Sequence, residues 1–283
     1  MGDNVLYEMQ DGVAHVVMNR PDNLNLLGED MITEIDDAMK EAERDPEVRV
    51  VILRGEGRAF SAGHDLVGTT RKEHELPRNI VEGRLDFEDE YYLEANLRIR
   101  NLKKPTIAGI KGHVVLGGLM TALMCDLVVA EESTNIWNPS IRHAGTGGEV
   151  MMLPWDIGVR RTKEMLWTGD PLDVHEAQRL GMVSRVVPDG TLVAECQRLA
   201  DRIALMPPRM LQLTKRSLNK LQEIQGMLIA YEHHFVVHQL GHASQEAADW
   251  NAEAAEARKA GGFKEWLQFR DGPFDEQAKR EYA

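Results

Sequence analysis

Apolar positions along the chain follow two different spacings, and these spacings predict where strands and helices lie. Short apolar runs typical of strands occur at five places in the first half of the chain: 5–8, 13–18, 48–53, 105–110 and 127–130. Asp11-Gly12 separates the first two runs and predicts a tight hairpin turn. Apolar residues then recur at helical spacing over 29–43. Strand and helix alternate through about residue 130, and this alternation predicts an α/β core.

The second half of the chain has a different pattern, which predicts mostly helices. Helical spacing extends through four segments, and one strand is predicted among them at 182–187; the segments are 151–155, 160–167, 174–180 and 192–205. After Pro207-Pro208, the segment 209–250 predicts long helices with breaks at Gly226 and Gly241. We therefore expect a core at 1–205 and a helical C-terminal region at 206–283 that docks on another subunit.

Apolar residues in the segment 68–95 recur at no regular spacing. It gathers four acidic side chains near its end: Asp86, Glu88, Asp89 and Glu90. A solvated surface loop is the simpler interpretation, and a lid over a site is the alternative. A helix is expected after it, over 93–102.

Composition and charge exclude several classes of function. The chain has 283 residues, of which 43% are hydrophobic and 28% charged, as in an ordinary globular protein. Its formal net charge of −13 argues against a nucleic-acid or anionic-membrane partner, because both require a basic face. No apolar run approaches the ~20 residues of a membrane-spanning helix, and the N-terminus lacks signal-peptide organisation. These features predict a soluble cytoplasmic protein, whose two cysteines, Cys125 and Cys196, are reduced core thiols.

Two glycine-containing turns carry the strongest indication of chemistry. RGEGRAFSAGHDL (54–66) and IKGHVVLGGLMTALMCD (110–126) each begin as a strand-like run, break at glycines and resume as a helix. Glycine leaves backbone N–H groups uncovered, and a helix N-terminus adds the positive end of its dipole. Two such turns facing one point would stabilise a developing oxyanion.

These turns belong to a larger set of motifs that resembles the crotonase superfamily, the enoyl-CoA hydratase/isomerase group. The resemblance covers nearly the whole chain and rests on NRPDNLNLL (19–27), the two turns, WTGDPLDVHEAQRLGMVSRVVP (167–188) and FKEWLQFRDGPF (263–274). It implies an α/β spiral of ββα units capped by C-terminal helices. It also implies an acyl-CoA substrate, no cofactor beyond the coenzyme A of that substrate, and assembly as a homotrimer or a dimer of trimers.

The resemblance assigns roles to individual residues. The backbone N–H groups of His64 and Gly117 correspond to the oxyanion hole. The coenzyme A portion is expected along a further set of positions, in which the Asp22 carboxylate is unusual because it would repel phosphates: Asp22, Asn23, Leu24, Ala62, His64, Asp65 and Leu66.

Two other positions depart from the family pattern. Hydratases of the family use two glutamates, and their positions here hold Met120 and Ser140. Neither a thioether nor an unactivated hydroxyl can exchange a proton near pH 7 as a carboxylate does. The usual water addition, and the isomerisation that keeps the second glutamate, therefore need other residues.

Three interpretations of this loss remain open. In the first, another acid or base is recruited: Glu149, expected to open a helix, is the leading candidate; His143 is a weaker one, and an acid from 86–90 a third. In the second, the chain binds acyl-CoA without chemistry. In the third, His234, His238 and His242 bind a metal, since they recur every four residues, with Glu246 continuing the row. An interhelical polar seam is the favoured interpretation of this row, and no metal is expected.

We therefore expect an acyl-CoA-processing enzyme of the hydratase/isomerase type, with a backbone oxyanion hole and non-standard acid–base residues. The alternatives are a C–C bond hydrolase or isomerase acting on a bulky acyl-CoA, and the binding protein without activity.

Overall fold

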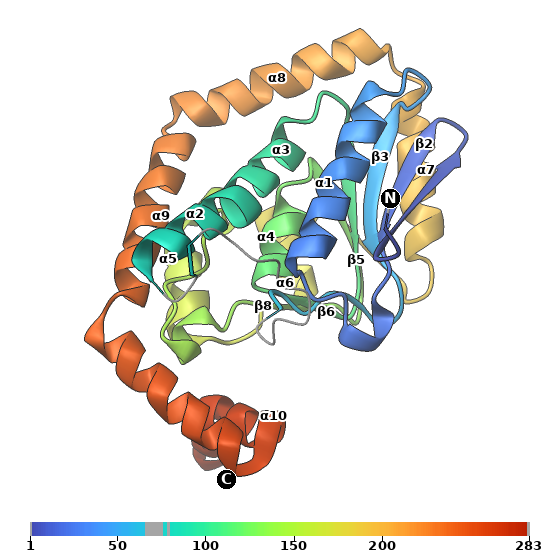
Figure 1. Cartoon of the computed structure of the whole chain (residues 1–283). Coiled ribbons are helices and arrows are strands. Elements are labelled where there is room, and N and C mark those ends of the chain that lie inside the picture. The colour runs from blue at the N-terminus through green and yellow to red at the C-terminus, as the bar shows by residue number, and fades with distance from the viewer. Residues whose placement is uncertain (1, 66–75, 78–79, 282–283) are drawn as a thin grey trace.

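A sheet of six strands lies in the right-hand part of the molecule in the view of Figure 1. The computed structural model describes residues 2–65, 76–77 and 80–281. The six strands lie in the order β1 (Val5–Gln10), β2 (Val13–Met18), β3 (Val50–Gly55), β5 (Thr106–Ile110), β7 (Leu127–Glu131) and β9 (Arg185–Val187). A second sheet orders β4 (Ala59–Ser61), β6 (His113–Val115) and β8 (Asn135–Trp137).

The predicted N-terminal hairpin is confirmed, and it supplies the antiparallel edge of the large sheet. β1 and β2 pair antiparallel, with Gln10 opposite Val13. Asp11 and Gly12, which join them, both have positive φ angles, 50° and 78°. Aspartate and glycine tolerate this left-handed conformation, which a two-residue hairpin turn requires. The remaining neighbours in the sheet pair parallel.

Helices cover both faces of the large sheet, because alternate residues of each strand point to opposite sides. On one face, α1 (Glu29–Arg44) packs on strand residues such as Val16 and Val51, and α4 (Gly117–Leu123) joins the same core cluster. On the other face, α7 (Leu192–Ala204) packs on Val50 and Ile52 of β3 and their neighbours. The helix expected over 29–43 is thus present, and its apolar stripe faces the sheet.

The prediction of an irregular segment through residue 95 is wrong from residue 81 onward. The chain there is continuously helical: α2 (Val81–Glu88), the π-helical η2 (Asp89–Glu94) and α3 (Ala95–Asn101). A π turn bonds residue i to i+5, so the helical period of 3.6 breaks where η2 intervenes. Residues 68–75 and 78–79 lie outside the described residues.

The second half of the chain is mostly helical, as expected. α5 (Leu153–Thr168) joins two predicted segments across a kink at Gly158, and α6 (Val174–Leu180) follows. α8 (Pro208–Ile224) and α9 (Met227–His242) are separated at Gly226, as predicted. α10 (Gln245–Glu281) kinks at Gly261 and Gly262. No helix in the described part of the chain is long and apolar enough to cross a membrane.

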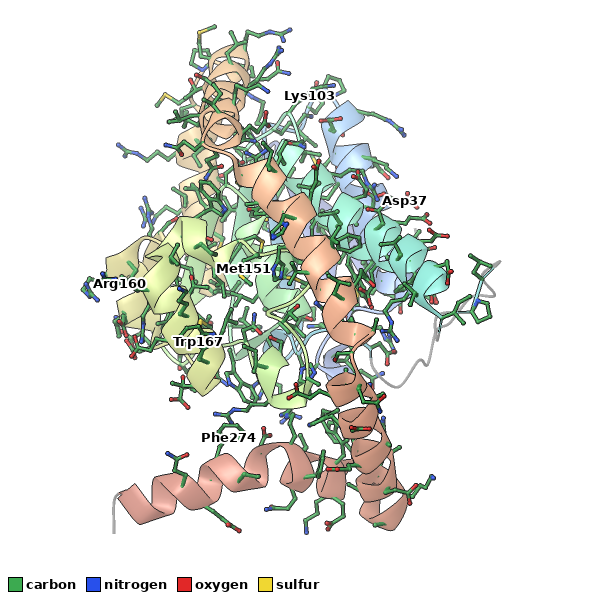
Figure 2. The ribbon with its side chains drawn as sticks, turned by 90° about the vertical axis from the view of Figure 1, so that its left-hand side faces the viewer. Asp37, Lys103, Met151, Arg160, Trp167 and Phe274 are labelled. Atoms are coloured by element: carbon green, nitrogen blue, oxygen red, sulfur yellow. The ribbon has the colours of Figure 1, made fainter. Side chains whose placement is uncertain are left out.

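The last helices wrap around one side of the molecule and then return to it. Figure 1 shows α8 along the top, α9 descending beside α2 and α5, and α10 extending below the sheets. Beyond its kink, α10 runs underneath the body, with Phe274 directed toward it (Figure 2). The Arg142 guanidinium lies 3.9 Å from the centre of the Phe274 ring. This contact fixes the C-terminal part of α10 near η3 (Ser140–His143). The division at residue 205 and the role of 206–283 in assembly stay predictions.

Candidate active site

The two glycine turns singled out in the sequence lie against each other. The first follows β4 and turns at Gly63, which has a positive φ of 96°; the second leads into α4 at Gly117. A Cβ atom built on Gly63 would lie 3.7 Å from the backbone nitrogen of Gly117 and 3.0 Å from the carbonyl oxygen of Val115. Gly63 therefore provides both the backbone conformation and the close approach that bring the turns together.

The N–H groups of His64 and Gly117 are both available at this junction. The Leu27 N–H donates to the Gly63 carbonyl at 2.8 Å, and the Asp65 N–H donates to the Leu27 carbonyl at 3.1 Å. The N–H of His64, between them, therefore points to the opposite side. In the turns and loops that the structure describes, neither the His64 nor the Gly117 N–H donates to a carbonyl. Two unpaired donors at one junction can stabilise an oxyanion.

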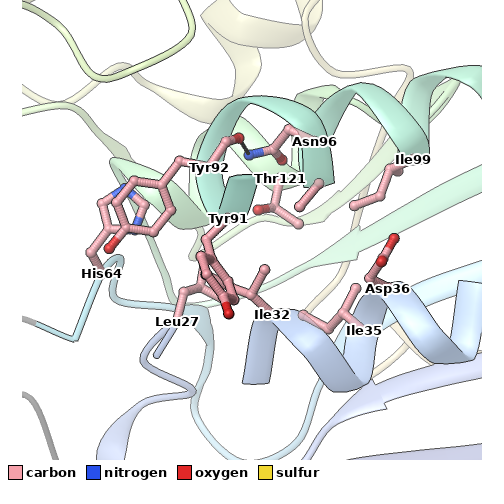
Figure 3. Close-up of a pocket in the computed structure, with 11 residues that line it drawn as sticks. Leu27, Ile32, Ile35, Asp36, His64, Tyr91, Tyr92, Asn96, Ile99 and Thr121 are labelled. Carbon is pink, nitrogen blue, oxygen red and sulfur yellow. Dashed lines mark hydrogen bonds between the residues drawn. The ribbon is translucent and has the colours of Figure 1, made fainter. Parts of the chain in front are cut away.

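The His64 imidazole is buried at the same junction, and only 7% of the side chain is exposed. It lies directly over Gly117, where an added Cβ would be 2.5 Å from its Cε1 atom. Its other face stacks on the Tyr92 ring, with centroids 3.9 Å apart (Figure 3). Nε2 is 3.1 Å from a carboxylate oxygen of Glu149, and Nδ1 has no hydrogen-bond partner among the described residues.

Glu149 is brought to His64 by a loop and does not open a helix, so that part of the prediction is wrong. α5 begins only at Leu153, and Glu149 follows Gly147 and Gly148, whose φ angles are 115° and 105°. Asn138 holds the loop by donating from Nδ2 to the Gly147 carbonyl at 2.8 Å. Glu149 is 5% exposed, and its side chain points to the imidazole instead of compensating a helix dipole.

The charges around Glu149 keep it ionised. Burial alone would raise its pKa, but the charges of His64 and His238 and the hydrogen bond from His64 lower the pKa below its ordinary value. Oε2 contacts His64 Nε2 at 3.1 Å, and Oε1 lies 3.7 Å from Nε2 of His238. The carboxylate is therefore shared between two imidazoles.

A cavity of about 390 Å³ opens beside His64 and Glu149. Ser140 and His143, two of the residues named from the sequence, line it as well. Ser140 is buried, and its hydroxyl has no partner among the described residues. Burial and the nearby Arg270 lower the pKa of His143 to about 4, so this ring is neutral at pH 7. The far wall comes from α10 and comprises Ala247, Trp250, Asn251, Ala254, Ala255, Arg258 and Trp266.

Met120 lies beneath this cavity and is not among the described residues that line it. Its side chain is 2% exposed, and a Cβ atom on Gly148 would be 2.9 Å from its sulfur. The thioether thus packs under the loop that carries Glu149. Its position in the core explains why an apolar side chain fits there.

A second polar cluster, formed by Glu88, His238 and His242, lines the same cavity. His238 Nε2 lies 2.9 Å from His242 Nε2 and 3.5 Å from a Glu88 oxygen, and its Nδ1 lies 2.8 Å from the Thr146 hydroxyl. Burial opposes protonation of His238, but the hydrogen bond and charge of Glu88, with the charge of Glu149, raise its pKa. Burial and His238 lower the pKa of His242.

The members of the predicted histidine row therefore do not share one site. His234 contacts the Gly148 carbonyl at 2.9 Å, while Glu246 is exposed on α10. Of the four acids at 86–90, only Glu88 is buried.

A small apolar cavity of about 20 Å³ also borders the His64–Tyr92 stack (Figure 3). Both rings line it, together with side chains of α1, η2, α3 and α4. Five of the eleven lining residues are aliphatic: Leu27, Ile32, Ile35, Ala95 and Ile99. The two stacked rings therefore contribute to the walls of both cavities.

The positions expected along coenzyme A lie close to the first glycine turn. Asp22 and Asn23 are exposed in η1 (Pro21–Asn23), and the Leu24 carbonyl accepts a hydrogen bond from the Ala62 N–H at 3.0 Å. Asp65 is tied to Leu27, as described above. Leu66 lies outside the described residues. Of this set, His64 alone lines the large cavity in the described part of the chain.

Sequence reasoning missed Tyr92, Trp250 and Trp266 as parts of the site, since nothing local marks them. It noticed His238 and His242 by their spacing of four but not the partner at Glu88, which comes from 150 residues earlier in the sequence.

Comparisons with known proteins give a consistent result. A family model described as "Enoyl-CoA hydratase/isomerase" matches residues 8–259. A putative enoyl-CoA hydratase of Mycobacterium tuberculosis is 39% identical over 256 residues, which cover 84% of this chain and 80% of the relative. The crystal structure of an enoyl-CoA hydratase/isomerase from Xanthobacter autotrophicus Py2 superposes with a TM-score of 0.85 at 33% identity, covering 96% of this chain and 99% of that one. A probable enoyl-CoA hydratase from Mycobacterium smegmatis gives a TM-score of 0.80 at 37% identity, covering 86% and 96%. The predicted α/β crotonase fold is confirmed by these neighbours.

Proposed function

Because the chain belongs to the enoyl-CoA hydratase/isomerase family, we propose that it binds an acyl-CoA thioester beside His64 and catalyses proton transfer next to the thioester carbonyl. The observation that carries the proposal is the contact of His64 with Glu149 at the junction of the two glycine turns. The junction offers the two components that such a reaction needs, a site for negative charge and a group that exchanges a proton.

The site for negative charge is the pair of N–H groups of His64 and Gly117. Removal of a proton from the α-carbon moves charge onto the thioester oxygen, as does addition of water to the β-carbon. Fixed N–H donors stabilise that oxyanion more than the neutral carbonyl, and one such donor contributes about 3 kcal/mol to lowering a barrier. The absence of a carbonyl partner for either donor in the described turns and loops supports this role.

The proton-exchanging group in this proposal is Nδ1 of His64. It has no hydrogen-bond partner among the described residues, while Nε2 faces the Glu149 carboxylate. With its N–H on Nε2 donated to Glu149, the ring has a lone pair on Nδ1 that can accept a proton. The ionised carboxylate then stabilises the imidazolium and fixes the tautomer, as in other histidine–carboxylate pairs.

The reaction balances without any further group. In an isomerisation, Nδ1 takes a proton from one carbon, the electron pair passes to the thioester oxygen, and the proton returns to another carbon of the conjugated system. In a hydration, Nδ1 takes a proton from water while the water oxygen bonds to the β-carbon, and the electron pair of the double bond passes to the thioester oxygen. Nδ1 then returns that proton to the α-carbon. Isomerisation passes through a conjugated dienolate and hydration through the enolate of a β-hydroxyacyl thioester, and both carry their negative charge on the thioester oxygen.

We further propose that the chain assembles through α8. None of its residues is buried, and its exposed side chains include Met210, Leu213, Leu218, Leu221 and Ile224. An exposed row of large apolar side chains on one helix is typical of an interface between subunits. The expected assembly is a trimer or a dimer of trimers, and sedimentation velocity of the purified chain measures it.

The experiment that tests the function is turnover of a panel of 2-enoyl-CoA, 3-enoyl-CoA and β-ketoacyl-CoA esters, followed by mass spectrometry. His64→Ala keeps the backbone N–H and removes the imidazole, so kcat should fall about 100-fold or more. Free imidazole added to His64→Ala should restore part of the activity. Glu149→Gln keeps an acceptor for Nε2–H but removes the charge, and kcat should fall more than KM rises. His233→Ala, on the exposed side of α9, is the matched control.

Three outcomes would contradict the proposal in different ways. If CoA esters bind but none is converted, the chain is a binding protein. If no ester binds, the inference from the family fails for this chain. If β-ketoacyl esters are cleaved while enoyl esters are unchanged, the C–C hydrolase interpretation replaces it.

A further inference from the structure

We propose that Glu88, His238 and His242 form a binding site for a divalent transition metal ion in the wall of the large cavity. The sequence led to the opposite expectation, a polar seam without a metal. The proposal concerns a different set of residues from the row at 234, 238 and 242, because Glu88 replaces His234.

The spacing of the donor atoms fits one ion. One oxygen of Glu88 and one nitrogen from each histidine all lie within 4.8 Å of one another. The two Nε2 atoms are 2.9 Å apart, and the Glu88 oxygen is 3.5 Å from Nε2 of His238. Two ligands held at about 2.1 Å around a tetrahedral ion are roughly 3.4 Å apart, so small side-chain adjustments complete the geometry.

Four groups that can bind a metal converge on one point. Nε2 of His238 meets three groups: His242 at 2.9 Å, Glu88 at 3.5 Å and Glu149 at 3.7 Å. A single ring nitrogen carries at most one proton, so it cannot bond to all three. A cation at this point would satisfy both imidazole lone pairs and both carboxylates together. Glu149 would then be a candidate fourth ligand through Oε1, while its Oε2 stays with His64.

The surroundings orient the ligands as metal sites require. His238 Nδ1 lies 2.8 Å from the Thr146 hydroxyl, which can accept its proton and leave Nε2 free to coordinate. Gln239 donates from Nε2 to the same Glu88 oxygen at 2.6 Å. Glu88 and His238 are buried, and the cluster faces the cavity, which provides an entry path and open coordination positions.

The donor set selects the class of ion. Two imidazoles and one carboxylate bind Zn²⁺ and its first-row neighbours, whereas Mg²⁺ and Ca²⁺ prefer all-oxygen sites. The site lies beside the proposed acid–base pair, but neither proposal depends on the other. Metal binding is measured without a thioester, so a protein that binds no Zn²⁺ does not contradict the proposed turnover. A protein that converts no thioester likewise does not contradict the proposed metal site.

The test is equilibrium binding of Zn²⁺ to the full chain after treatment with a chelator, by calorimetry and elemental analysis. We expect one ion per chain. His242→Ala and Glu88→Gln should each weaken binding about 100-fold or more, and Thr146→Val by about 10- to 100-fold. His233→Ala, on the exposed face of α9, and His234→Ala, one turn before the cluster, should bind as the wild type does. Mg²⁺ at the same concentration should not compete.

X-ray absorption of the Zn²⁺ protein provides a check that needs no variant, and it should show two imidazole ligands. Circular dichroism of each variant separates lost binding from lost folding. The proposal is overturned if the wild type binds no stoichiometric Zn²⁺, or if absorption shows no imidazole. It is also overturned if folded His242→Ala and Glu88→Gln proteins retain wild-type affinity, or if His234→Ala weakens binding as much as His242→Ala does.

Discussion

Replacement of Gly117 by alanine tests the packing that holds the His64 ring in place. The new Cβ would lie 2.5 Å from Cε1, 2.7 Å from Nε2 and 2.8 Å from Nδ1 of that ring. Optimal contacts between such atoms are about 3.5 to 4.0 Å, so the ring must move by roughly 1 Å. It cannot move without loss, because Tyr92 stacks on its other face at 3.9 Å and Glu149 holds Nε2 at 3.1 Å.

Two effects should follow from Gly117→Ala. Forced repacking in a filled site costs about 1 to 3 kcal/mol of unfolding free energy. A displacement of about 1 Å at a reacting group can reduce the rate about 100-fold, so kcat on the best thioester should fall by that order. Urea denaturation and steady-state kinetics measure the two effects separately. Gly117 does not have a positive φ angle, so backbone strain does not contribute.

The matched control is the same change in a His64→Ala background. Without the ring there is space for the Cβ, and alanine is a better helix former than glycine, by up to about 1 kcal/mol. Gly117→Ala should therefore be neutral or slightly stabilising in that background, which gives a coupling energy of about 1 to 3 kcal/mol. An equal cost in both backgrounds would refute the placement of the ring over Gly117.

Three further predictions concern the scaffold. Asn25→Ala should lower the unfolding free energy by about 2 to 4 kcal/mol in urea denaturation, because the buried Asn25 side chain serves the Arg20 N–H and the Glu56 and Ala59 carbonyls; a loss under 1 kcal/mol would contradict this. Burial raises the pKa of Asp156 to about 7. Between about pH 4 and pH 7, the folded state therefore keeps a proton on Asp156 that the unfolded chain has already lost. The free energy of unfolding falls as pH rises through that window. Asp156→Asn should remove this fall, so it should be more stable than the wild type by roughly 1 to 3 kcal/mol near pH 8 and differ little near pH 4. If the stabilities of the wild type and the variant change with pH in parallel, Asp156 is not the cause of the fall. Met120→Glu should lower the free energy of unfolding by about 3 kcal/mol or more, because it buries a carboxylate under the Gly148 loop. Thermal or urea unfolding measures this loss. The variant should not hydrate enoyl-CoA esters faster than the wild type, and a gain in hydratase activity would contradict this prediction.

Features encoded by neighbouring residues could be predicted from the sequence. Asp11-Gly12 specified the hairpin because the turn conformation depends on those two residues alone. The apolar stripe of 29–43 specified a helix, observed as α1 (Glu29–Arg44), and its buried face. The same reasoning failed at 81–94 because the π turn in η2 shifts the period, and a fixed period of 3.6 does not detect such a shift.

The site itself was only partly predictable. The glycine turns were found because each is a local motif with a backbone role. The contact of His64 with Glu149 spans 85 residues, and it depends on the positive φ angles of Gly147 and Gly148, which no local pattern reports. The same holds for Glu88 and His238, which α2 and α9 bring together. Long-range pairing of polar side chains was therefore the main information that the sequence alone did not provide.

If a thioester enolate forms at His64 and Gly117, the enzyme should exchange the α-protons of a saturated acyl-CoA in D₂O. Exchange reports enolate formation whatever the final product is, and ¹H NMR or mass spectrometry measures it. We predict enzyme-dependent exchange that falls about 100-fold or more in Glu149→Gln and His64→Ala, while binding of the ester is retained. No enolate forms at His64 and Gly117 if the protein binds the ester but exchanges no α-proton, and His64 is not the base if His64→Ala exchanges at the wild-type rate.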